Sequence, residues 1–191
     1  MYKPLLGAIG IGLTFFAYLP YIRSIVQGKT RPHVFSWVIW GTSTCIVFLA
    51  QLTDKGGAGA WVIGVSGIIS IYVAILAYLK RSDSTITRID WLFFILAMTS
   101  LPLWYLTSDP LWAVVLLTTV DVLGFGPTFR RAYIHPFEEQ LMFYVIMAVR
   151  NLIVVLALEN YSLTTVLFPA TIAVVCLIFS LMVVSRRRVV A

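Results

Sequence analysis

Long apolar runs alternate with short polar segments along the whole chain. Each run is close to the length of about 20 residues that an α-helix needs to cross the hydrocarbon core of a membrane. The pattern therefore predicts transmembrane helices at residues 4–22, 34–52, 60–79, 91–107, 111–129, 140–158 and 163–185. A helical bundle is expected, because the backbone must satisfy its own hydrogen bonds within lipid.

The composition supports this interpretation. Of 191 residues, 60% are apolar and 12% are charged, whereas an average soluble domain is roughly 45–50% apolar and about 25% charged. The excess excludes a water-soluble globule, a disordered chain and a disulfide-rich secreted protein. The predicted fold class is an all-α polytopic membrane protein with seven transmembrane helices.

The positive charges predict an orientation. In a seven-helix topology, the amino-terminal side carries only Lys3 and Lys55, and Arg150 lies within a span. The other side carries eleven cations: Arg23, Lys29, Arg31, Lys80, Arg81, Arg88, Arg130, Arg131, Arg186, Arg187 and Arg188. The positive-inside rule then places the amino terminus outside and the carboxyl terminus in the cytoplasm. The excess of basic residues is thereby explained without a nucleic-acid partner, and the short loops favour a bacterial cytoplasmic (inner) membrane.

A shift of 107 residues superposes the first three spans on the last three without a gap. It places Pro20 on Pro127 and Arg23 on Arg130. The fourth span has no counterpart, and this single extra crossing lets both triplets cross the membrane in the same direction. We therefore expect a first three-helix bundle at 4–81, a linker with the fourth helix at 82–110 and a second bundle at 111–188.

This 3+1+3 plan of parallel repeats resembles the SWEET and PQ-loop superfamily. The local resemblance lies in Leu19-Pro20-Tyr21-Ile22 and Gly126-Pro127-Thr128-Phe129, which end the first helix of each triplet. This chain has Pro-Tyr and Pro-Thr where PQ-loop proteins have Pro-Gln, and it lacks the proline that SWEETs carry in the second helix of each triplet. The resemblance implies two three-helix bundles with a central pocket that opens alternately to each side. It does not imply a particular substrate.

Two charged residues lie within predicted spans. Asp121 and Arg150 are each about ten residues from the ends of their spans, near mid-depth. A charged side chain there costs on the order of 2.5–3.5 kcal/mol, so each marks a candidate functional site. Three interpretations are open: a structural ion pair, a site in which Arg150 binds a polar or anionic solute with Asp121 as counter-ion or amine partner, or a proton-coupled site in which Asp121 titrates.

The same depth in the first repeat carries hydroxyl side chains. Under the 107-residue shift, Thr14 corresponds to Asp121, Ser43 to Arg150 and Thr44 to Asn151. These residues predict an asymmetric substrate site, charged on one half and lined by hydroxyls on the other. Trp40 shares a helical face with Ser43 and is a further candidate for this site, although packing alone also explains it.

Two more groups of residues are candidates for conformational change. Pro20 and Pro127, with Gly124 and Gly126 beside the latter, either form hinges or simply end their helices at the membrane surface. In the cytoplasmic loops, Lys29 and Arg31 of the first repeat face Glu138 and Glu139 of the second under the pseudo-twofold relation. They are candidates for a cytoplasmic gate, or for two independent solvated turns.

The predicted function is that of a secondary transporter or facilitator of a small polar or charged solute. The alternative is a seven-helix membrane receptor or sorting protein that binds a ligand without moving it. An enzyme is not expected, since both histidines lie in loops and no catalytic motif is present. No cofactor and no metal site are predicted, and two triplets in one chain allow a monomer to form a complete pathway.

Overall fold

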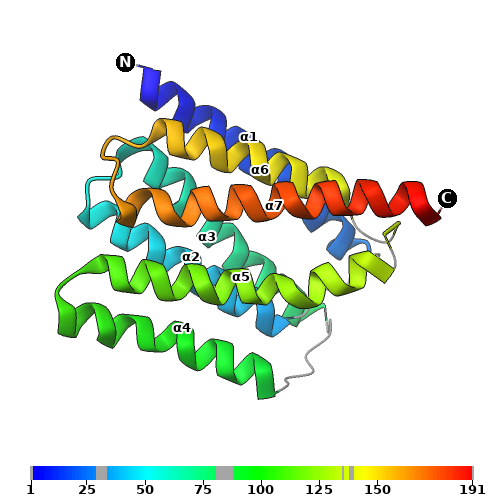
Figure 1. The fold of residues 1–191 in the computed structure, drawn as a ribbon, viewed down its shortest axis with the longest axis horizontal. Helices are drawn as coiled ribbons and strands as arrows, with labels where there is room; N and C mark the ends of the chain where they lie inside the picture. The colour runs from blue at the N-terminus through cyan, green and yellow to red at the C-terminus, as the bar shows by residue number, and fades with distance from the viewer. Residues whose placement is uncertain (1, 29–33, 81–87, 135, 138–139, 191) are drawn as a thin grey trace.

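The computed structural model describes residues 2–28, 34–80, 88–134, 136–137 and 140–190. Over these residues the chain forms helices and no strands, as the sequence predicts (Figure 1). The helices are α1 (Tyr2–Val26), α2 (Val34–Thr53), α3 (Gly57–Leu79), α4 (Arg88–Thr107), α5 (Pro110–Ile134), α6 (Leu141–Ala157) and α7 (Leu163–Val190).

The helices have the character of membrane segments. Within the described residues, α1, α2, α3 and α7 are long and apolar enough to cross a membrane. The other three contain shorter apolar stretches, Phe94–Thr107 in α4, Pro110–Gly126 in α5 and Leu141–Ala157 in α6. Many large apolar side chains, among them Ile68 and Tyr105, point away from the bundle. These features indicate an integral membrane protein, with four of the predicted spans supported by length.

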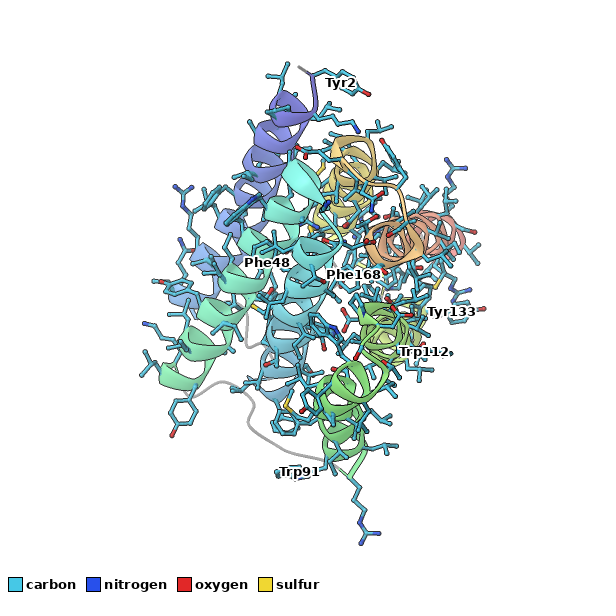
Figure 2. The ribbon with its side chains drawn as sticks, turned by 90° about the vertical axis from the view of Figure 1, so that its left-hand side faces the viewer. Tyr2, Phe48, Trp91, Trp112, Tyr133 and Phe168 are labelled. Atoms are coloured by element: carbon cyan, nitrogen blue, oxygen red, sulfur yellow. The ribbon has the colours of Figure 1, made fainter. Side chains whose placement is uncertain are left out.

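The third helix of each predicted triplet packs between the other two. Helix α3 contacts both α1 and α2, and α7 contacts both α5 and α6. The two groups meet through contacts of α1 and α3 with α6, and of α2 with α5 and α7. Figure 2 shows α1, α2 and α3 on one side and α5, α6 and α7 on the other. Helix α4 lies at the edge of the bundle against α5 and α2 (Figure 1).

Local sequence explains several helix boundaries. Helix α5 begins at Pro110, where the missing N–H is not needed, and the Asp109 carboxylate accepts the N–H of Leu111 at 2.9 Å. Helix α1 continues to Val26 and does not end at Pro20. Helix α5 likewise continues past Pro127 to Ile134. The interpretation that these prolines end their helices is therefore wrong, since each lies within a helix.

The turns between helices gather at two ends of the bundle (Figure 1). The amino terminus lies at one end, with the α2–α3, α4–α5 and α6–α7 turns, and we call this the amino-terminal end. The carboxyl terminus lies at the opposite end, together with the last turns of α1, α3 and α5. Between the two ends, side chains such as Val47, Val62 and Val154 are fully buried and form the core.

Candidate functional site

Arg150 of α6 is the largest fully buried side chain described in the bundle, with 1% of its surface exposed. Its guanidinium group is held by three hydrogen bonds from three helices. Nε donates to Thr14 Oγ1 of α1 at 3.1 Å, and one terminal nitrogen donates to the carbonyl of Val62 in α3 at 2.8 Å. The other donates to Asn151 Oδ1 at 2.9 Å. We call these four residues the Arg150 cluster.

The partners of Arg150 are themselves fixed. The Thr14 hydroxyl donates to the carbonyl of Gly10 at 2.8 Å, which leaves its oxygen free to accept from Arg150. Asn151 Nδ2 donates to the carbonyl of Met147 at 2.8 Å, which turns Oδ1 toward Arg150. All three partners are neutral, and the bonds use three of the five N–H donors of a guanidinium group. Among the described residues the cluster thus holds a positive charge without an acidic hydrogen-bond partner, and two further N–H donors, inside the bundle.

Asp121 of α5 is the second buried charged residue in the described part of the chain, with 5% of its surface exposed. Its Oδ1 atom has no hydrogen-bond partner, and the same is true of Ser43 Oγ on α2 and Thr118 Oγ1 on α5. Ser43 interacts with the Asp121 carboxyl across the α2–α5 interface, but outside hydrogen-bonding geometry. Thr118 lies three residues before Asp121, on the same face of α5. We call these three residues the Asp121 cluster.

Trp40 lies one helical turn before Ser43 on α2 and contacts α5 one turn after Asp121. A Cβ atom on Gly124 would lie 3.2 Å from Trp40 Nε1, so the absence of a side chain at Gly124 lets the indole approach the helix. The Trp40 ring is 6.3 Å from that of Phe125 and 5.7 Å from that of Trp37. Trp40 therefore packs directly beside the Asp121 cluster.

The structure does not bring Asp121 and Arg150 together. The hydrogen bonds of Arg150 to the residues that the structure describes all go to neutral groups, and Asp121 Oδ1 has no partner among them. The ion pair considered from the sequence assumes that consecutive antiparallel helices are neighbours. Here α7 packs against both α5 and α6 and lies between them. The two charged residues consequently belong to different interfaces, α1–α6 and α2–α5.

The other candidate residues fall into three groups. Thr44 is buried in α2, but the hydrogen bonds of the Arg150 cluster do not reach it. Around a Cβ atom on Gly126 there is open space, in contrast to Gly124. The four residues of the predicted cytoplasmic gate lie outside the described residues: Lys29, Arg31, Glu138 and Glu139.

Several buried polar residues were not singled out from the sequence, among them Thr118, Tyr18 and Gln51. The Tyr18 hydroxyl, one turn from Thr14, lies 3.3 Å from Ser66 Oγ and 3.1 Å from Ser70 Oγ. Gln51 Nε2 of α2 donates to the carbonyl of Thr165 in α7 at 2.8 Å. Gln51 could have been found from the sequence, because it is an amide side chain within an apolar run. Tyr18 gave no such signal, since tyrosine is common at both ends of membrane helices.

The α2–α3 and α6–α7 turns are joined at the amino-terminal end of the bundle. Asp54 accepts hydrogen bonds from the Ser162 hydroxyl through Oδ2 and from Asn160 Nδ2 through its carbonyl oxygen, the latter at 3.0 Å. The N–H of Glu159 donates to the carbonyl of Gly56 at 3.2 Å. Gly57 has a φ of +64°, a conformation that favours glycine, and lies directly against the Glu159 side chain. These Asp54 turn contacts close this end of the bundle.

The two clusters offer complementary chemistry at the contacts between the two groups of helices. The Arg150 cluster presents positive charge and N–H donors, which bind anionic or polar acceptor groups. The Asp121 cluster presents a carboxylate and two hydroxyl oxygens, which bind cations or donors. No protein-family model, no curated protein and no solved structure matches this chain.

Proposed function

We propose that the protein is a membrane transporter that moves a small polar or anionic solute by alternating access. Its two moving parts are the bundles α1–α3 and α5–α7, and α4 is the linker. In this proposal the amino terminus lies outside and the carboxyl terminus in the cytoplasm. The end of the bundle assigned to the cytoplasm includes Arg23 and the Arg186–Arg188 run, as the positive-inside rule requires.

The packing of the helices supports two related bundles. Exchange of α1 with α5, α2 with α6 and α3 with α7 converts each bundle into the other. The same exchange converts the α1–α6 contact into the α5–α2 contact, and the α3–α6 contact into the α7–α2 contact. A pseudo-twofold relation of this kind is the arrangement that the resemblance to the SWEET and PQ-loop superfamily implies.

The two polar clusters obey the same relation. The 107-residue shift converts Thr14 into Asp121 and Ser43 into Arg150. The Thr14–Arg150 contact between α1 and α6 is therefore the counterpart of the Asp121–Ser43 contact between α5 and α2. Chemically different residues thus occupy equivalent positions on either side of the pseudo-twofold axis, which favours an asymmetric solute.

The observation that carries the proposal is the buried guanidinium group of Arg150 with only neutral partners. A structural role alone would be served better by an apolar side chain or by an ion pair, because an uncompensated buried charge is costly. A solute with a carboxylate, phosphate or other acceptor group compensates this charge when it binds. The two remaining N–H donors give such a group a place to bind.

Alternating access requires the bundles to separate at each end in turn. The Asp54 turn contacts join the α2–α3 turn to the α6–α7 turn. In this proposal they hold the amino-terminal end of the bundle, which is the outer end, closed in this conformation. Pro20 and Pro127 remove one helical hydrogen bond each within continuous helices, so both provide a point where α1 and α5 can bend. We propose that opening of the outer end breaks the Asp54 turn contacts.

The experiment begins with a thermal-shift screen of small anionic and polar metabolites on the purified protein in detergent. Ligands that stabilise the wild type are then tested for uptake into proteoliposomes. Arg150→Ala and Arg150→Lys are expected to lose stabilisation and uptake, because lysine keeps the charge but not the planar fork of donors. Arg88→Ala, which removes an exposed arginine at the start of α4, is the matched control.

Two results would contradict the proposal. A ligand that stabilises the protein in an Arg150-dependent manner but never crosses the proteoliposome membrane would identify a receptor, not a transporter. Uptake that Arg150→Ala leaves unchanged would show that the solute binds elsewhere.

A further inference from the structure

The Asp121 cluster contains three of the buried polar atoms that have no hydrogen-bond partner: Asp121 Oδ1, Ser43 Oγ and Thr118 Oγ1. Their residues expose 5%, 0% and 5% of their surfaces. Buried polar atoms in proteins are nearly always satisfied, so three unsatisfied oxygen atoms on two packed helices require an explanation. All three belong to acidic or hydroxyl side chains, and α2 and α5 pack directly against each other.

Other buried hydroxyl groups of the same bundle behave differently. Thr14 donates to Gly10 at 2.8 Å and Ser180 to Cys176 at 2.8 Å, in each case to the carbonyl four residues earlier. This internal bond is the usual solution for serine and threonine in an apolar helix. Ser43 and Thr118 do not make it, although a carbonyl four residues earlier is available to both. Both hydroxyl groups therefore lack the internal bond that Thr14 and Ser180 make, and their oxygen atoms remain available to a ligand.

We infer that the Asp121 cluster is a binding site for a monovalent metal cation such as Na⁺, with Asp121 Oδ1, Ser43 Oγ and Thr118 Oγ1 as protein ligands. Oxygen atoms are the ligands that hard cations prefer. One carboxylate balances one positive charge, so the occupied site is neutral in its apolar surroundings.

A divalent ion and a proton fit the cluster less well. Calcium sites usually contain several carboxylates, and the described residues hold no group of three acidic, histidine or cysteine side chains that could bind a metal ion. A proton on Asp121 removes the charge, but within the described residues Asp121 Oδ1, Ser43 Oγ and Thr118 Oγ1 make no hydrogen bonds to one another or to other groups, so a proton alone leaves them without partners. A metal cation satisfies all three oxygen atoms at once. The inference goes beyond the proposed function, since cation binding does not require transport.

The test measures thermal unfolding of the purified protein in detergent while NaCl replaces choline chloride at constant ionic strength. Wild type is expected to show a saturable rise in Tm of several degrees with Na⁺, since a ligand that binds only the folded state stabilises it by mass action. Asp121→Asn is expected to abolish the rise, and Thr118→Val and Ser43→Ala to shift it to at least tenfold higher Na⁺ concentration. Thr119→Val is the matched control, because the adjacent Thr119 is exposed and its hydroxyl is bonded to Val115 at 2.8 Å.

Each outcome decides the question. A wild-type Tm that does not depend on Na⁺, or a rise that persists equally in Asp121→Asn and Thr118→Val, overturns the inference. A Tm that depends on pH through Asp121 but not on Na⁺ identifies a proton site and also overturns it. If Asp121→Asn fails to fold, Thr118→Val and Ser43→Ala carry the test. Arg150→Ala is expected to keep the full Na⁺ response, because Arg150 belongs to the α1–α6 interface and not to the Asp121 cluster. The Na⁺ response therefore tests the cation site independently of the transport proposal.

Discussion

Replacement of Thr14 by valine tests the geometry of the Arg150 cluster directly. Valine has nearly the shape of threonine but lacks the hydroxyl oxygen that accepts from Arg150 Nε at 3.1 Å. Hydrogen bonds to charged groups contribute about 1.5–3 kcal/mol in proteins. Interhelical bonds within membranes contribute less, about 0.6 kcal/mol on average and about 1.7 at most. Because Arg150 is charged and almost fully buried, we expect a value near that maximum, a loss of about 1.5 kcal/mol.

The assay is the free energy of unfolding in mixed detergent micelles for Thr14→Val, Arg150→Met and the double variant. The coupling energy in this double-mutant cycle is expected to be about 1.5 kcal/mol. Arg150→Met already removes the hydrogen bond, so Thr14→Val has no bond left to lose in that background. The control Thr119→Val is expected to stay within about 0.5 kcal/mol of wild type, as exposed substitutions usually do. A Thr14→Val variant as stable as Thr119→Val, or a coupling below about 0.5 kcal/mol, would refute the hydrogen bond as described.

Two other predictions concern contacts between the bundles. Pro169 lacks an N–H, so the carbonyl of Thr165 has no helical donor and accepts from Gln51 instead. Gln51→Leu is expected to lower the free energy of unfolding by about 1–2 kcal/mol in wild type and by clearly less in a Pro169→Ala background. Equal losses in the two backgrounds would contradict this. Gly59→Ala is expected to cost about 1–3 kcal/mol, because the new Cβ would lie 2.7 Å from the carbonyl oxygen of Val154. Gly12→Ala has open space around it and is expected to be neutral or stabilising in the same unfolding measurement.

The arrangement of helices along the chain was predictable because apolar runs are long and turns are short. The boundaries were less so: α1 continues to Val26 and α7 to Val190, beyond the predicted ends at residues 22 and 185. Helices can extend past the hydrocarbon core, where hydropathy no longer reports on them. Hydropathy therefore predicts the apolar part of a helix and not its full length.

The candidate site was predictable in its residues but not in its contacts. Asp121 and Arg150 stood out because charge is costly in an apolar run. Their partners depend on which helices are neighbours, and α7 separates the two helices that the sequence places next to each other. The 107-residue shift related Thr14 to Asp121, but it did not indicate that Thr14 accepts a hydrogen bond from Arg150 across the α1–α6 interface.

The position of α3 and α7 has a consequence for how the chain is made. In each triplet, the helix that contacts the other two is the last to leave the ribosome. After synthesis of α2, the nascent chain holds two helices whose partners within their own bundle are still missing. Ser43 and Gln51 then have to remain shielded from lipid until α5 and α7 arrive. Release of α1 and α2 into the bilayer is therefore expected to await the later helices, so that insertion and folding are coupled along the chain.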